Sequence, residues 1–156
     1  MENSIPELTE IEIAWLAGLF EGEGSFTLDK RKKNLSIDSP PPSPVFVISM
    51  TDLDVMEKVG QLLNQNVLEL KRLTTTGLKV YRVQCQNREK VCKFCKILYP
   101  FMGIRRKKQI EICLDACESY NSWIAQGKKT IIAKKANLKS QESKKKRLSE
   151  VSKQEC

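Results

Sequence analysis

Histidine is absent from the 156 residues of this chain. Its absence excludes schemes in which an imidazole activates a serine or cysteine nucleophile, and it excludes zinc sites with histidine ligands. Aromatic residues are few, and no apolar run approaches the roughly 20 residues that span a bilayer. Any catalysis must therefore rest on carboxylates, amines, guanidinium groups or a bound metal ion, and no membrane partner is expected.

The chain also lacks a recognisable targeting segment at its start. The first ten residues, MENSIPELTE, are acidic and do not have the basic and apolar parts of a signal peptide. We therefore expect an intracellular protein, in the cytoplasm of a prokaryote or in an organelle matrix.

Positive charge is concentrated at the C-terminal end. Residues 128–156 contain ten Lys or Arg and three Glu, a net charge of +7, whereas the rest of the chain carries a net charge of +1. This contrast predicts one domain over residues 1–127 and a basic tail over 128–156, partly helical or flexible. Such a tail favours polyanions such as nucleic acid through counterion release, although a merely solvated end explains it equally well.

Four of the six cysteines fall in two close pairs, Cys92-x-x-Cys95 and Cys113-x-x-x-Cys117. Four thiolates at such spacings can hold zinc, so a zinc-stabilised interaction module is one alternative. Both pairs, however, lie on the apolar faces of expected helices, where cysteine acts as a small buried residue. The pattern therefore favours buried thiols, and a disulfide would be unusual in the cytosol.

Hydrophobic periodicity predicts an α+β domain with the element order αββαββα. Helices are expected to end at Gly22 and to cover 52–63, 88–98 and 105–120, and strands to cover 25–33, 45–50, 67–73 and 78–86. Two hairpins next to helices predict a four-stranded antiparallel sheet that is covered by helices on one face.

The uncovered face of this sheet is predicted to be polar and to bind DNA. A β surface with Lys, Arg, Gln and Thr and few carboxylates can enter the major groove, whereas an ordinary solvated face is the alternative. The residues expected to contact DNA are Ser25, Thr27, Asp29, Arg31, Lys33, Val47, Ser49, Lys71, Arg82 and Gln84.

The stretch IAWLAGLFEGEGSF, residues 13–26, ends a helix in acid and glycine. Carboxylates at Glu21 and Glu23 oppose the helix macrodipole at a cost of roughly 0.3–1 kcal/mol each, which indicates a functional site rather than a solvated helix end. Gly18 and Gly22 lie four residues apart on one helix face, where the lack of side chains lets a second helix approach closely.

Within this stretch, LAGLFEGEG at residues 16–24 resembles the LAGLIDADG motif of the homing endonucleases, with Glu in place of Asp at both acidic positions. Since only one copy is present, the resemblance implies an intron-encoded homodimer with a saddle-like DNA-binding sheet. It further implies a site-specific double-strand endonuclease that cuts across the minor groove, leaves 3′ overhangs and recognises a long, pseudo-palindromic target.

The resemblance assigns roles to the residues of the motif. Glu23 would be the metal ligand, with the Gly22 carbonyl as a second oxygen, and the dimer interface would contain Gly18, Leu19, Glu21 and Gly22. Two Glu23 carboxylates near a two-fold axis would repel each other unless cations lie between them. Mg²⁺ is expected because it prefers oxygen ligands, and Ca²⁺ or Mn²⁺ can take its place.

Two other family positions are matched less directly. Met50 stands where the family often has Gln and cannot orient a water by a strong hydrogen bond, so Thr51, Ser49 or ordered solvent would take that role. In PFMGIRRKKQ, counting from Pro100 matches the family's basic residue to Arg105, and counting back from Gln109 matches it to Arg106. We favour Arg106, with Lys108 as a further cation that stabilises charge on the phosphate.

A non-catalytic nucleic-acid binder on the same fold, either an RNA maturase or a transcription regulator, is the main alternative function. Retention of both acids favours cleavage, whereas Met50 argues mildly against efficient cleavage.

Overall fold

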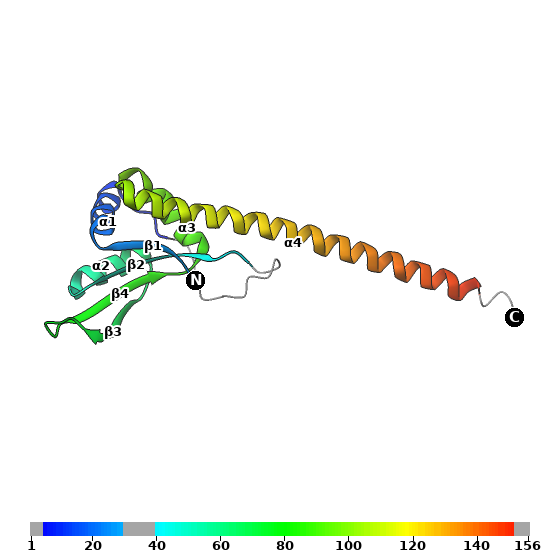
Figure 1. Ribbon diagram of the computed structural model, residues 1–156, viewed down its shortest axis with the longest axis horizontal. Coiled ribbons are helices and arrows are strands. Elements are labelled where there is room, and N and C mark those ends of the chain that lie inside the picture. The colour runs from blue at the N-terminus through cyan, green and yellow to red at the C-terminus, as the bar shows by residue number, and fades with distance from the viewer. Residues whose placement is uncertain (1–4, 30–39, 152–156) are drawn as a thin grey trace. The chain divides into compact units, whose positions relative to one another are not determined.

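The computed structural model describes residues 5–29 and 40–151 (Figure 1). Two compact units divide the chain, Met1–Ser119 and Tyr120–Cys156. The elements are α1 (Glu10–Gly22), β1 (Gly24–Asp29), β2 (Ser43–Met50), α2 (Leu53–Leu63), β3 (Val67–Leu73), β4 (Lys79–Cys85), α3 (Arg88–Leu98), the 3₁₀ turn η1 (Tyr99–Phe101) and α4 (Ile104–Val151). This order confirms the predicted α+β arrangement, while a boundary at residue 127 stays a prediction.

The four strands form one antiparallel sheet in the order β1-β2-β4-β3. The register pairs Phe26 with Phe46 and Phe46 with Cys85, which places these three side chains in one row. Because side chains alternate along a strand, this row defines the inner face of the sheet. The β3–β4 pairing loses its regular register between Glu69 and Leu73.

The helices of the first unit cover the inner face of the sheet (Figure 1). Side chains from α1, α2, α3 and α4 join the strands in one buried cluster. Its largest fully buried members include Phe20 of α1, Phe46 of β2, Phe94 of α3 and Ile110 of α4. The predicted one-sided cover of the sheet is therefore confirmed.

Helix α1 begins at a capping box. The Thr9 hydroxyl accepts a hydrogen bond from the Glu12 amide at 3.3 Å, and the Glu12 carboxylate accepts one from the Thr9 amide at 2.8 Å. The hydrogen bonds that the Thr9 amide and the Thr9 hydroxyl donate to the Glu12 carboxylate lower the pKa of Glu12. Thr9 is thus the N-cap of α1.

Apart from the end of β1, beyond which the residues are not described, two element boundaries differ from the sequence prediction by more than one residue. Strand β2 begins at Ser43 instead of residue 45, because Pro44 pairs only with Leu28 of β1 and the pairing of β2 with β4 starts at Phe46. Helix α4 continues to Val151 instead of ending near residue 120. Residues 121–151 contain no proline and only one glycine, so no strong helix breaker interrupts them.

The prediction of buried thiols is correct for one cysteine of each sequence pair and wrong for the other. Cys95 and Cys113 are free and fully buried, as expected, whereas Cys92 and Cys117 are joined in a disulfide between α3 and α4. Within residues 5–29 and 40–151, no group of three or more His, Cys, Asp or Glu side chains could hold a metal ion. The zinc module therefore gains no structural support.

None of the helices in the described part of the chain has the length and apolarity that crossing a membrane requires.

The turn from α1 into β1 depends on a glycine. A Cβ at Gly24 would lie 2.8 Å from backbone atoms of Phe20, which cannot move without disturbing the core. We therefore expect Gly24→Ala to lower the free energy of unfolding by about 1–3 kcal/mol in chemical denaturation. Gly127→Ala is the matched control, because a Cβ there meets nothing within 4 Å and alanine favours the helix. Equal stability of both variants would contradict this interpretation.

Candidate active site at the end of the first helix

Glu23 ends α1 in an exposed position. Its backbone amide donates to Leu19 O at 2.9 Å, which closes the last helical turn, and β1 begins at the next residue. The Glu23 carboxylate makes no hydrogen bond or ion pair with any residue that the structure describes. It is therefore available to a ligand from outside the chain, and the carbonyl of the exposed Gly22 lies next to it in the sequence.

Glu21 points in another direction, toward the start of α4. Its Oε2 accepts a hydrogen bond from the Gly103 amide at 3.0 Å, and the Gly103 carbonyl in turn accepts the Lys107 amide in the first turn of α4. A Cβ at position 103 would lie only 3.0 Å from Glu21 Oε1. A carboxylate at a helix N-terminus interacts favourably with the macrodipole, so α4 offsets the penalty that Glu21 incurs at the end of α1.

Arg106, in the first turns of α4, is buried against the same helix end with a relative exposure of 6%. Its Nε donates to Glu21 O at 3.2 Å, and its Nη1 donates to Gln109 Oε1 at 3.0 Å. Burial, and next the charge of Arg105, lower the pKa of Arg106, while Glu21 and Glu23 oppose this shift. The guanidinium therefore lies within electrostatic reach of both acids of the motif.

One nitrogen of this guanidinium remains available. Nη2 of Arg106 makes no hydrogen bond with any described residue. In the described ranges, every side-chain nitrogen or oxygen that is buried has a hydrogen-bond partner, so Nη2 is not one of the buried atoms. Nη2 therefore contacts solvent. An arginine held at Nε and Nη1 with Nη2 exposed is positioned to donate to an external anion.

Arg105 and Lys108 are exposed on the same part of α4. The structure thus brings Arg106, of the two arginines that the sequence offered, into contact with α1 through the Glu21 carbonyl. The catalytic roles of all three cations remain predictions.

The predicted DNA-binding residues of the strands largely share the outer face of the sheet. Ser25 pairs with Val47 and Val47 with Gln84, while Ser49 pairs with Arg82 and accepts its Nε–H at 3.1 Å. Thr27 and Asp29 continue this face along β1. Lys71 is exposed but falls where the β3 register is irregular, and Arg31 and Lys33 lie outside the described residues.

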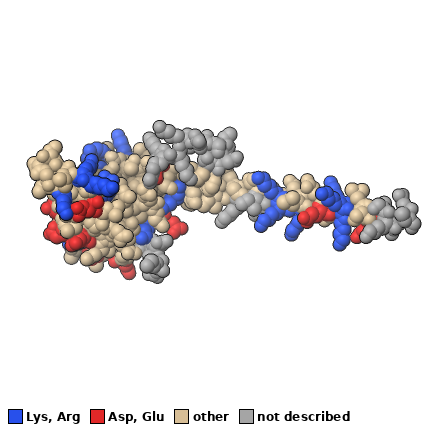
Figure 2. Space-filling model, turned by 90° about the horizontal axis from the view of Figure 1, so that it is seen from below, with Lys and Arg blue, Asp and Glu red and all other residues tan. Residues whose placement is uncertain are grey.

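The side of the domain opposite the helices is largely uncharged in its described part (Figure 2). Lys and Arg gather at one border of it, and Asp and Glu gather along another. Arg82 is the basic side chain that the register places within the face. A basic character over the whole face stays a prediction, because Arg31 and Lys33 lie outside the described residues.

Met50 packs partly against the core, so it offers no polar group to the site. Ser49 is already bonded to Arg82, and Thr51 is exposed in the bend after β2. All three of the predicted substitutes for the family's Gln stay open.

The outward side of α1 is uncovered in the single chain. Gly18 and Gly22 are exposed, and a Cβ at either would meet nothing within 4 Å. Ile11, about two helical turns before Gly18 on the same side, is 83% exposed. Leu19 differs from the other predicted interface residues, because it packs partly against the chain's own core.

Sequence reasoning missed Gly103 and Gln109 as parts of the site. Gln109 follows Arg106 by three residues on one helix, a spacing that puts the two side chains on the same face and could have been recognised. Gly103 gave no such signal, because its role depends on α1 and α4 meeting in three dimensions.

The fold and the site together define a class of protein: an α+β domain whose first helix ends in exposed acid beside a buried arginine and an open antiparallel sheet. A family model described as LAGLIDADG endonuclease matches residues 16–114. The chain belongs to this family. Among curated protein sequences, none matches the chain.

Solved structures with the same fold are homing endonucleases. One is I-CvuI in complex with the I-CreI target in 2 mM Mg, with 15% identity, a TM-score of 0.52 and coverage of 75% of both chains. A second is intron-encoded I-CeuI complexed with DNA, with 19% identity, a TM-score of 0.57 and coverage of 77% of this chain and 60% of that chain. A third is I-SmaMI bound to cleaved DNA, with 21% identity, a TM-score of 0.54 and coverage of 85% and 46%.

The two acids of the motif should affect stability differently. Glu21→Ala removes the carboxylate that bonds the Gly103 amide, so we expect the free energy of unfolding to fall by about 1 kcal/mol. Glu23→Ala removes an exposed carboxylate without a partner in the described chain, so stability should stay within about 0.5 kcal/mol of wild type. Denaturant titration of both variants measures the difference, and a larger loss for Glu23→Ala would contradict these assignments.

Proposed function

We propose that this protein is a site-specific double-strand DNA endonuclease that works as a homodimer and requires Mg²⁺. The observation that carries the proposal is that the exposed Glu23, which bonds no described residue, lies within electrostatic reach of Arg106, whose Nη2 bonds no described residue either. Glu23 follows the end of α1 and precedes β1, an edge strand of the sheet, and Arg106 of α4 is bonded to this helix end through the Glu21 carbonyl.

The residues present fit a magnesium site shared between chains. Glu23 and the Gly22 carbonyl offer oxygen atoms, which Mg²⁺ prefers, and Mg²⁺ is commonly held by one or two carboxylates together with substrate phosphates. When bound, Mg²⁺ supplies charge neutralisation at the phosphate and activation of water. Ca²⁺ or Mn²⁺ would bind to the same oxygen ligands.

The cations of α4 would act on the substrate's charge. Arg106 is fixed at two nitrogens and would donate through Nη2 to a phosphate oxygen, stabilising the negative charge that builds up there during cleavage. Arg105 and Lys108, which are exposed, would attract the DNA backbone toward this end of the helix.

The proposed dimer contact uses the exposed side of α1. Gly18 and Gly22 leave room for the backbone of a second α1, and Ile11 offers apolar surface that water would otherwise contact. A two-fold contact along this helix would bring two copies of Glu23 together, one for each DNA strand. Leu19 and Glu21 would then border the contact.

The nature of the DNA target follows from this symmetry. A two-fold dimer reads two related half-sites, which favours a long, pseudo-palindromic target. The structures of I-CvuI and I-CeuI in complex with DNA support DNA as the partner here. Cuts across the minor groove with 3′ overhangs, and a gene within an intron, complete the proposal by family resemblance.

A second candidate is a nucleic-acid binder without cleavage activity, either an RNA maturase or a transcription regulator. The observation in its favour is Met50, which packs partly against the core. It stands where the family often has Gln, so the side-chain amide that would orient a water is missing at this position. Fold alone does not separate the two functions.

Cleavage should depend on the Glu23 carboxylate. In a Mg²⁺-dependent cleavage screen on a library of random or intron-flanking DNA, we expect the wild type to cut and Glu23→Gln to lose at least about 100-fold in rate. Binding of the same DNA in Ca²⁺ should remain, because the substitution keeps the size of the side chain. Glu118→Gln, at an exposed position of α4, is the control and should cut like the wild type.

Unchanged cutting by Glu23→Gln would exclude the proposed metal ligand. Sequence-specific binding by a wild type that never cuts would instead support the maturase or regulator.

Dimerisation should depend on the bare surface at Gly18. Since a Cβ there meets nothing within the chain, Gly18→Leu should fold normally but sediment as a monomer. Ser122→Leu adds the same side chain at an exposed position of α4 and should remain dimeric. Analytical ultracentrifugation compares the two, and a stable dimer of Gly18→Leu with full activity would refute the helix contact.

A further inference from the structure

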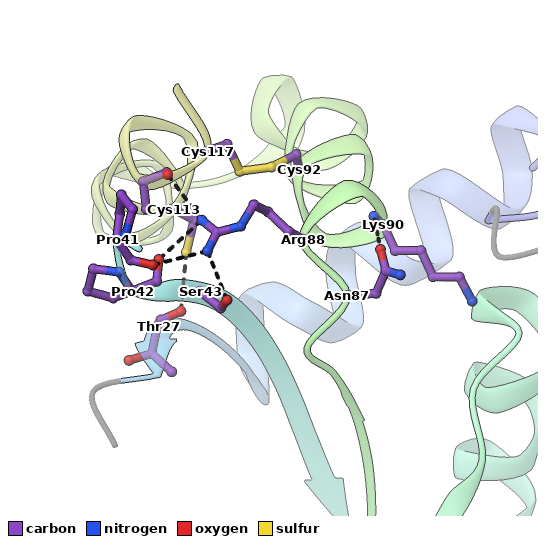
Figure 3. The surroundings of a disulfide bond; sticks show 11 residues. Thr27, Pro41, Pro42, Ser43, Asn87, Arg88, Lys90, Cys92, Cys113 and Cys117 are labelled. Carbon is purple, nitrogen blue, oxygen red and sulfur yellow. Dashed lines mark hydrogen bonds between the residues drawn. A yellow bond between two sulfur atoms is a disulfide. The ribbon is translucent and has the colours of Figure 1, made fainter. Parts of the chain in front are cut away.

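Two pairs of cysteines connect α3 and α4. Cys92 and Cys117 form a disulfide (Figure 3), and Cys95, three residues after Cys92 on α3, forms a hydrogen bond with Cys113, four residues before Cys117 on α4. One interface thus contains an oxidised pair and a reduced pair side by side. The two pairs differ in what surrounds them.

The reduced pair is sealed inside the protein. Cys95 and Cys113 are both 0% exposed, and Cys113 Sγ donates to Thr27 O at 3.5 Å. The hydrogen bond with Cys113 and burial raise the pKa of Cys95, whereas the hydrogen bond with Cys95 lowers the pKa of Cys113. Both residues are inaccessible to a reagent from solvent, so their burial makes this pair resist oxidation and exchange.

The oxidised pair lies nearer the surface. Cys92 is half-buried on α3, whereas Cys117 is 8% exposed. Because Cys92 is the more exposed residue of the two, we expect a thiolate from solvent to attack at Cys92. Access of this kind is one of the factors that set the rate of thiol–disulfide exchange.

Other contacts hold α4 in place beside the disulfide. Arg88 of α3 donates through Nη1 to Ala116 O and to Pro42 O, both at 3.2 Å, and through Nη2 to Pro41 O at 3.1 Å and Ser43 Oγ at 3.0 Å (Figure 3). Ile110 and Cys113 of α4 are also fully buried in the core. These contacts do not depend on the disulfide, so we expect α4 to stay packed against α3 and the core when the disulfide is broken.

We propose that Cys92–Cys117 is a reversible thiol–disulfide exchange site that takes a dithiol reductant and sets how firmly α4 is held against α3. The thiolate of the dithiol attacks Cys92 Sγ, the bond between the two cysteines breaks, and Cys117 leaves as a thiolate that takes up a proton. The second thiol of the reductant then attacks its own sulfur in the mixed disulfide and releases Cys92. The dithiol loses two electrons and two protons, and the two cysteines gain them.

Reduction should loosen α4 only near Cys117, at the end of the part of the helix that belongs to the first unit. The bond links residues 25 positions apart, so its loss returns chain entropy to the unfolded state and lowers stability. Arg106 lies 11 residues earlier and is held by Glu21 and Gln109 instead. The site at the end of α1 should therefore keep its arrangement in the reduced protein.

The test treats the folded, full-length protein with dithiothreitol, labels it with iodoacetamide and maps the labels by peptide mass spectrometry. We expect Cys92 and Cys117 to be labelled under native conditions and Cys95 and Cys113 to be labelled only in denaturant. The Tm should fall by about 5–10 °C, and amide exchange should become faster in residues 113–119 but not in 104–108.

Two variants make the test decisive. Cys92→Ser with Cys117→Ser should reproduce the Tm of the reduced wild type and respond no further to dithiothreitol. Cys156→Ser should behave like the wild type, which excludes exchange through the C-terminal thiol. Simultaneous labelling of all four helical cysteines, or reduction that requires denaturant, would overturn the proposal, because the disulfide would then open only through global unfolding.

Discussion

The burial of Phe20 is the constraint on which the site depends. Its ring lies 5.0 Å from that of Phe94 and 5.7 Å from those of Phe26 and Phe46, measured between centroids, so it is fixed by one helix and two strands. Since each residue of a helix turns by about 100°, fixing Phe20 inward turns Gly18 and Gly22 outward. The same packing sets the direction in which the chain leaves α1 and therefore the position of the acids.

The two acids of the motif differ in their contacts because their surroundings differ. Glu21 is drawn to the amide of Gly103, at the positive end of α4, and this contact joins the end of one helix to the start of another. Glu23 comes after the last turn, where no described residue reaches it. One carboxylate is therefore used to build the junction, and the other stays available for a ligand.

The sequence predicted the elements, the one-sided cover of the sheet and the motif, since these depend on local periodicity and on nine consecutive residues. It favoured Arg106 over Arg105 but left both open, because counting along the motif from Pro100 and counting back from Gln109 give positions that differ by one residue. In the structure, Arg106 is the one that donates a hydrogen bond to the Glu21 carbonyl. The Cys92–Cys117 bond was missed for a similar reason: an apolar helix face predicts burial of a thiol but not which thiol lies opposite.

The part of α4 in the first unit is thus fixed at two places by different chemistry. Near its start, hydrogen bonds from Gly103 and Arg106 attach it to α1, and near Cys117 a covalent bond and Arg88 attach it to α3. The two attachments lie about 16 Å apart along the helix, given its rise of about 1.5 Å per residue. Since Ile110 and Cys113 are buried between them, a change at Cys117 would have to disturb core packing before it reached Arg106. Packing in the middle of α4 therefore lets the arginine stay fixed while the disulfide opens and closes.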